Sequence, residues 1–177
     1  MSKPTRMQVS EYLATTFRPD QDYVDGELKE RNLGATPHGT VQGVLFALFL
    51  ANRTAWGGRP LMEQRIQISP TRVRVADVCV HRLGKALGTI ATTSPWICIE
   101  IVAYDQTLSD MQERVEDYLE AGVENIWIID PRRRRAWVAT ATGPVIVSTG
   151  EFTVPESPVR IALADIYEQL DEMAAGR

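Results

Sequence analysis

The chain contains few of the residue types on which many active sites depend. It has two cysteines, two histidines and, among its 19 basic residues, only three lysines. Cys79 and Cys98 lie in separate apolar runs without the ligand spacing of a zinc site, so we interpret them as buried thiols. The sequence also shows no Ser-His-Asp or Cys-His constellation and no glycine-rich phosphate loop. A histidine metal centre is thereby excluded, and a lysine-dependent mechanism has almost no candidates.

Long apolar segments are missing as well. No stretch approaches the roughly 18 apolar residues that a transmembrane helix needs, and the basic segment Met1–Arg6 leads into no apolar run typical of a signal peptide. We therefore expect no membrane partner and a cytoplasmic location, in which thiols stay reduced. The net charge of −4 argues against non-specific electrostatic binding of a polyanion over a large part of the surface.

The composition favours one globular domain over residues 1–177. Hydrophobic residues make up 44% and charged residues 24% of the sequence, as in ordinary globular proteins. A chain of this length buries roughly 70% of its unfolded surface, so a single hydrophobic core suffices. No internal repeat, low-complexity tract or linker divides the sequence.

Hydrophobic periodicity predicts a mixture of helices and strands. Helices are expected over 9–17, 39–54, 109–121 and 163–173, and strands over 61–68, 72–81, 96–102, 125–129, 136–140 and 145–147. The Asp25-Gly26 pair predicts a tight turn between two short strands. The order of strand 96–102, helix 109–121 and strand 125–129 predicts a parallel crossover, and so an α/β (α+β) fold.

Two of the apolar strands each contain a single carboxylate, Asp77 and Glu100. A lone carboxylate in a buried strand is costly unless it is paired, protonated or bound to a cation. Hard cations such as Mg²⁺ bind one or two carboxylates, with water and phosphate oxygens completing the shell. The alternative is that each acid pairs with a nearby arginine such as Arg65, Arg74 or Arg114.

The hairpin before this region determines what faces Asp77. If Ser69 opposes Arg72 across a two-residue loop, Asp77 faces Gln64. A slip by one residue would place Glu63 there instead. Either neighbour could orient a ligand or a water.

Three further features have two interpretations each. Arg114 lies at the edge of a helix stripe, facing the site or forming a surface ion pair with Asp110. The run of four arginines over 132–135 is either a phosphate-contacting patch or a solvated loop. His38, at a helix start, is either a surface histidine or part of a site.

Seven stretches between about residues 20 and 140, in this order and spacing, resemble the Uma family of restriction-endonuclease-like proteins, within the PD-(D/E)XK nuclease superfamily. They are Tyr23-Val24-Asp25-Gly26-Glu27-Leu28, His38-Gly39, Arg74-Val75-Ala76-Asp77-Val78-Cys79-Val80, Ile99-Glu100-Ile101-Val102, Asp110 to Leu119, Ala121-Gly122-Val123 and Ile126-Trp127-Ile128-Ile129-Asp130-Pro131. An N-terminal helix and C-terminal strands plus a helix extend this core.

The resemblance implies a restriction-endonuclease-like core, in which a mixed central β-sheet is flanked by helices. It implies an endonuclease that hydrolyses phosphodiester bonds in DNA with Mg²⁺, or Mn²⁺ as a substitute. Asp77 and Glu100 stand at the family's metal-binding carboxylates, and the backbone carbonyl of Ile101 is the third metal ligand. Glu27 matches a family acid that reaches the same site.

Four residues are candidate contacts to the nucleic acid, one from the resemblance and three from the residue patterns described above. His38 matches a recurrent His-Gly pair at the second helix of the family. The other candidate DNA contacts are Gln64, which is expected beside Asp77, and Arg132 and Arg133 of the arginine run.

The chain departs from the superfamily pattern at its lysine. Val102 stands two residues after Glu100, where that lysine usually lies, and Arg114 stands where the following helix often supplies one. Arginine can stabilise developing charge or position a water, but it does not readily give up a proton and so cannot act as a general base. Arg114 is thus a catalytic candidate with a different role.

This departure and the acidic net charge leave a second hypothesis. The chain could be a catalytically impaired nuclease-fold protein that acts as a nucleic-acid-binding or protein-interaction module. Phe46 and Leu50 lie off the main apolar stripe of their helix, so this helix is either buried on several sides or meets a partner. A homodimer assembled through this helix is a third hypothesis, and it is compatible with catalysis.

Overall fold

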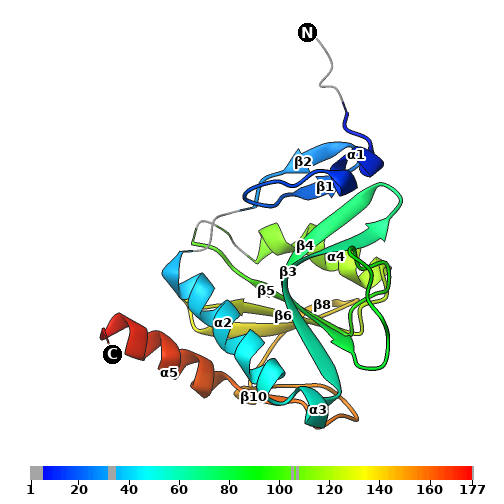
Figure 1. Ribbon diagram of the computed structural model, residues 1–177. Helices are drawn as coiled ribbons and strands as arrows, with labels where there is room; N and C mark the ends of the chain where they lie inside the picture. Colours follow the sequence, from blue (N-terminus) through cyan, green and yellow to red (C-terminus); the bar gives the residue numbers. More distant parts are fainter. Residues whose placement is uncertain (1–5, 32–34, 105, 107, 177) are drawn as a thin grey trace.

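A computed structural model describes residues 6–31, 35–104, 106 and 108–176, and its centre is a mixed β-sheet (Figure 1). The helices are α1 (Val9–Ala14), α2 (Thr36–Ala51), α3 (Arg53–Trp56), the 3-10 turn η1 (Ser109–Met111), α4 (Gln112–Glu120) and α5 (Leu163–Ala174). The strands are β1 (Asp22–Val24), β2 (Glu27–Lys29), β3 (Gly58–Ser69), β4 (Arg72–Arg82), β5 (Ile97–Ile101), β6 (Asn125–Asp130), β7 (Arg135–Thr140), β8 (Gly143–Ile146), β9 (Glu151–Thr153) and β10 (Arg160–Ala162).

The main sheet has the strand order β2-β1-β4-β5-β6-β7-β8, and β3 pairs with β4 beside this path. Strands β5 and β6 are parallel and are joined through α4, whereas the other pairings of the sheet are antiparallel. The predicted crossover and the mixed α/β fold are therefore confirmed.

Helices cover both faces of the sheet because side chains of the central strands alternate between them. Along β5, Ile97 and Ile99 pack in a cluster with residues of α2 and α5, which lie together in Figure 1. Cys98 instead packs with residues of α4 on the opposite face. Glu100, two residues after Cys98, consequently points toward α4 and away from α2.

Local sequence explains several boundaries. Asp25 and Gly26 both have positive φ, at 51° and 95°, which forms the predicted turn between β1 and β2. Helix α2 begins at Thr36, before the predicted Gly39, because Pro37 suits the first turn of a helix. Helix α1 ends at Ala14, three residues before the predicted Phe17.

Two expectations in the second half of the chain differ from the structure. Ser109 does not cap the helix that precedes β6: it lies within the 3-10 turn η1, whose N-cap is Leu108, and the N-cap of α4 is Met111. The short pair β9–β10 was not predicted, since strands of three residues carry too little periodicity. Phe152 of β9 nevertheless stacks on Trp127 of β6, with ring centroids 4.5 Å apart.

A β-bulge sets the register of the β3–β4 hairpin. Ser69 opposes Arg72 as predicted, but the pairing shifts by one residue between Gln67 and Ser69. Gln64 therefore opposes Ala76 rather than Asp77. The position across from Asp77 belongs to Glu63, whose φ is 50°.

Among the helices of the described residues, none is both long enough and apolar enough to cross a membrane.

Candidate active site

Asp77 and Glu100, on the adjacent strands β4 and β5, line one small cavity. The β4–β5 pairing ends at Val78 and Ile99, so the next residues in register are Asp77 and Glu100. Both carboxylates and Ile101 line the cavity, whose volume is about 50 Å³. Antiparallel register thus brings together two acids that lie far apart in the sequence.

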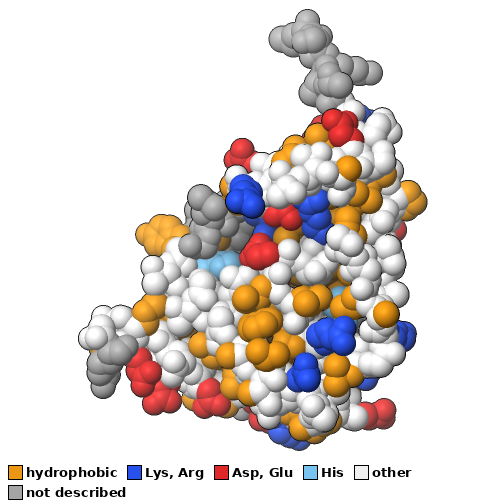
Figure 2. Space-filling model, in the orientation of Figure 1, with side chains coloured by type: hydrophobic (Ala, Val, Ile, Leu, Met, Phe, Trp, Pro, Cys, Tyr) orange, Lys and Arg blue, Asp and Glu red, His pale blue; other side chains and the backbone are white. Residues whose placement is uncertain are grey.

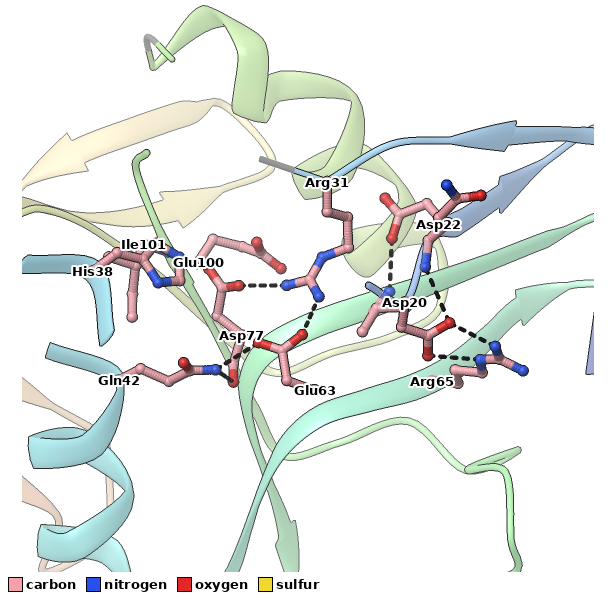
Figure 3. Close-up of polar contacts among 12 residues, drawn as sticks. Asp20, Asp22, Arg31, His38, Gln42, Glu63, Arg65, Asp77, Glu100 and Ile101 are labelled. Atoms are coloured by element: carbon pink, nitrogen blue, oxygen red, sulfur yellow. Dashed lines mark hydrogen bonds and ion pairs between the residues drawn. The ribbon is translucent and has the colours of Figure 1, made fainter. Parts of the chain in front are cut away.

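Asp77 is 4% exposed and each of its carboxylate oxygens has partners (Figure 3). Oδ1 accepts a hydrogen bond from Arg31 Nη2 at 2.5 Å. Oδ2 accepts one from the backbone amide of Ile101 at 2.8 Å and lies 3.2 Å from His38 Nε2. Burial raises the pKa of Asp77, but the His38 hydrogen bond and the Arg31 charge outweigh it and hold that pKa below its ordinary value. Asp77 is therefore a carboxylate at neutral pH.

Glu100 is held from the side of α4. Its Oε1 accepts hydrogen bonds from the Tyr118 hydroxyl at 2.6 Å and from Arg114 Nη2 at 3.0 Å, and its Oε2 accepts one from Arg114 Nε at 3.1 Å. Burial raises the pKa of Glu100; the Arg114 charge opposes this, and the nearby Asp77 charge adds to it, so the net shift is upward. A cation between the two acids would relieve their repulsion.

Arg114 is part of a buried network rather than a free cation. Besides Glu100, its guanidinium donates hydrogen bonds to the carboxylate of Asp22 and, at 2.7 Å, to the carbonyl of Val75. Asp22 also accepts hydrogen bonds from Arg74 Nη1 at 3.0 Å and from the amide of Val75 at 2.8 Å. The geometry therefore assigns Arg114 the positioning of Glu100. The alternative partner Asp110 has its side chain outside the described part of the chain.

Arg31 and Gln42 complete the surroundings of Asp77 and were not identified from the sequence, whereas Glu63 is the alternative neighbour that a one-residue slip predicted. Arg31 bridges Asp77 and Glu63, and Gln42 Nε2 donates to Glu63 Oε1 at 2.7 Å and to the carbonyl of Asp77 at 2.9 Å. Gln42 lies four residues after His38 on one face of α2, a spacing that could have revealed it. Arg31 follows β2 in a segment without periodicity, so no sequence pattern pointed to it.

The remaining predicted site residues lie elsewhere. Glu27 is on β2, where it pairs with Lys29 at 2.8 Å, and it is not among the described residues that line the cavity. Gln64 donates to the carbonyl of Arg65 at 3.1 Å. The structure thus brings His38 to the site, and does not bring Glu27 or Gln64 there.

The arginine run leaves β6 at the end next to the cavity. Arg133 pairs with Asp130 at 2.8 Å, and the amides of Arg132 and Arg133 both donate to Asp130 Oδ1. The guanidinium of Arg132 lies over the ring of Tyr104, 4.6 Å from its centroid. Strands β5 and β6 are parallel, so Tyr104, which follows β5, and Arg132 lie at the same edge of the sheet as Ile101. This edge is basic and aromatic.

The donor set fits a hard divalent cation in its chemistry. Two carboxylates of Asp77 and Glu100 share one cavity, and the amide of Ile101 points at Asp77, which directs its carbonyl to the same side of the strand. Among the described residues, no group of three or more His, Cys, Asp or Glu side chains could hold a metal ion. A cation here would therefore complete its shell with backbone, water or substrate oxygens.

The surface above this cavity carries charges of both signs. Figure 2 shows blue and red side chains mixed beside a pale blue histidine, between the β1–β2 hairpin and α2. The site is thus embedded in ion pairs and is not an open acidic pocket.

The mixed sheet and its flanking helices give this chain a nuclease-like fold. A family model, Uma2, described as "putative restriction endonuclease", matches residues 9–164. The chain belongs to this family, which confirms the resemblance noted in its sequence. Among curated proteins, no sequence matches it.

Two solved structures are similar in fold. A crystal structure described as "a putative nuclease belonging to DUF820" from Anabaena variabilis superposes with a TM-score of 0.78 at 17% identity, over 93% of this chain and 99% of that one. A cryo-EM structure of a DrdV–DNA complex gives a TM-score of 0.41 at 14% identity, over 76% of this chain and 11% of that one. The first structure shares the fold of this chain over nearly its whole length.

Proposed function

We propose that the protein is a Mg²⁺-dependent endonuclease that hydrolyses phosphodiester bonds in DNA. The observation that carries the proposal is the meeting of Asp77 and Glu100 in one cavity of a Uma2-family chain. These carboxylates, with the carbonyl of Ile101, would hold the ion. When bound, Mg²⁺ polarises a phosphate and lowers the pKa of a water, and Mn²⁺ would serve in its place.

The other residues of the site orient these ligands. Arg114 and Tyr118 fix both oxygens of Glu100, while His38 and the amide of Ile101 fix Oδ2 of Asp77. Such contacts matter because a misplaced ligand weakens both ion binding and catalysis. His38 thus acts by positioning Asp77, and we infer a supporting role for it rather than a direct DNA contact.

DNA contacts are proposed at the edge of the sheet beyond the cavity. Arg132 is exposed, and the ring beneath it, Tyr104, is 74% exposed. Arginine and backbone amides suit phosphate oxygens, and an exposed aromatic ring suits a sugar or base. Arg133, held by Asp130, would add positive charge beside them. Gln64 lies in the β3–β4 hairpin and is the weakest of the candidate DNA contacts.

The test is cleavage of supercoiled DNA by the purified protein in Mg²⁺ or Mn²⁺. We expect cleavage to fall at least about 100-fold in Asp77→Asn and in Glu100→Gln, because each loses a charged metal ligand. Glu27→Gln removes a carboxylate outside the cavity and is the matched control. Unchanged cleavage in Asp77→Asn would contradict the proposal.

A non-cleaving module is the second candidate. It is favoured by the arginines that already neutralise both acids, Arg31 at Asp77 and Arg114 at Glu100, and by the lack of a lysine among the described cavity residues. Salt-dependent DNA binding without cleavage in either ion would support this candidate over the endonuclease.

A homodimer is also proposed. Leu50 of α2 and Met62 of β3 are 48% and 44% exposed, and these two elements pack on each other. The proposal is that these two side chains belong to one apolar contact surface, since contiguous exposed apolar patches are typical of such surfaces.

A further inference from the structure

The carboxylate oxygens of Asp77 are not equivalent toward an incoming cation. Oδ2 is taken by the amide of Ile101 at 2.8 Å and by His38 at 3.2 Å. Both partners belong to regular secondary structure, Ile101 to β5 and His38 to α2. Oδ1 is taken by the Arg31 guanidinium at 2.5 Å. A cation that binds Asp77 must therefore compete with Arg31 for Oδ1.

Arg31 is held in this place by a second acid. Its other terminal nitrogen pairs with Glu63, which stands across the β3–β4 ladder from Asp77 and is itself fixed by Gln42. Only 14% of the Arg31 side chain is exposed. A buried guanidinium between two carboxylates supplies the positive charge that these acids require.

The cavity leaves little room for a second cation beside Arg31. Its volume of about 50 Å³ accommodates roughly one or two water molecules. Mg²⁺ gives up its waters reluctantly and usually keeps several of them. A partly hydrated ion at Asp77 would therefore crowd the guanidinium of Arg31 as long as that group stays on the carboxylate.

We propose that Arg31 occupies the place of the cation at Asp77, so that a divalent ion enters only by displacing it, and that the displaced guanidinium then pairs with a phosphate oxygen of the substrate. Guanidinium groups suit this exchange because they bind carboxylate and phosphate oxygens through the same paired N–H donors. The inference rests on the proposed metal-dependent function and adds a residue that contacts the substrate phosphate. A purely structural ion pair would affect folding without opposing metal binding.

The experiment is titration of the full chain with Mn²⁺, with free Mn²⁺ measured by electron paramagnetic resonance and no nucleic acid present. We expect Arg31→Gln to bind Mn²⁺ at least about tenfold more tightly than wild type, because a competing charge is removed. Arg82→Gln is the matched control: it removes the same charge from an exposed pair with Glu124 and should behave as wild type. Equal or weaker binding by Arg31→Gln would overturn the inference.

Two further variants keep the test decisive. If circular dichroism shows that Arg31→Gln is unfolded, Arg31→Lys decides: its single ammonium group cannot bridge Asp77 and Glu63 as a guanidinium does, so binding should tighten about threefold. Unchanged binding in Arg31→Lys would then overturn the inference. In a folded Arg31→Gln protein, adding Asp77→Asn should abolish the gain. A gain that survives Asp77→Asn would place the ion elsewhere and also overturn it.

The phosphate step has its own readout. A short DNA duplex should tighten Mn²⁺ binding to wild type more than to Arg31→Gln, because it supplies a partner for the displaced guanidinium. Equal tightening in both proteins would contradict this step. Tighter Mn²⁺ binding by Arg31→Gln together with no DNA cleavage by any variant would leave the metal competition standing and reject the endonuclease.

Discussion

The backbone amide of Ile101 donates a 2.8 Å hydrogen bond to Oδ2 of Asp77, at the point where the β4–β5 ladder has just ended. The side chain of Asp77 thus takes over an acceptor role that a backbone carbonyl would otherwise have. This contact fixes Asp77 against the strand that carries Glu100. It makes the relative position of the two acids a property of the sheet rather than of mobile side chains.

Arg114→Lys tests whether the guanidinium is needed for its geometry or only for its charge. Lysine cannot replace the separate hydrogen bonds to Glu100, Asp22 and the Val75 carbonyl. We expect the free energy of unfolding to fall by about 2 kcal/mol, as measured by urea denaturation, and any cleavage to fall with it. Arg82→Lys, in an exposed pair, is the control. Cleavage that rises in Arg114→Lys at wild-type stability would contradict this assignment.

Arg132→Ala tests the proposed DNA surface. Its guanidinium stacks on Tyr104 and has no role in the cavity itself. We expect weaker DNA binding, with the slope of log affinity against log salt reduced by about one. The measurement is fluorescence anisotropy over a salt series, and Arg160→Ala, which loses an exposed pair with Glu151, is the control. Identical salt slopes in wild type and Arg132→Ala would remove this surface from the proposal.

Asp130→Asn tests the turn that presents the arginine run. Burial raises the pKa of Asp130, but hydrogen bonds from the Arg133 amide and side chain and from the Arg132 amide outweigh it and lower that pKa. The stabilisation from this lowered pKa is therefore fully present at pH values above the pKa of Asp130 in the unfolded chain, about 4. It is lost as the pH falls through the lower pKa that Asp130 has in the folded protein.

The expected result is a loss of about 1–2 kcal/mol of unfolding free energy in Asp130→Asn at pH 7. Urea denaturation at decreasing pH should show this difference shrinking below about pH 4. A difference that stays constant down to pH 2 would show that the Asp130 charge contributes nothing.

Leu50→Asp tests the homodimer. If α2 contributes to the contact, light scattering should report a dimer for wild type and a monomer for Leu50→Asp, because a buried charge opposes association. Val145→Asp changes a residue on β8 that is even more exposed than Leu50, and it should leave the dimer intact. A monomeric wild type would reject the proposed dimer.

Much of the fold was predictable because hydrophobic periodicity reports it directly. The parallel β5–α4–β6 crossover and the turn at Asp25-Gly26 follow from short patterns that tertiary packing does not override. The two lone acids, Asp77 and Glu100, were predictable for a related reason, since carboxylates are rare in buried strands. The sequence thus predicts these strands and the two acids that they carry.

Tertiary structure decided which groups surround those acids. A bulge between Gln67 and Ser69 moved Gln64 away from Asp77 and set Glu63 across from it. Arg31 reaches Asp77 across 46 residues from a segment with no periodicity. Local sequence determines strands, helices and turns because these depend on neighbouring residues, whereas register shifts and long-range ion pairs depend on how the elements pack.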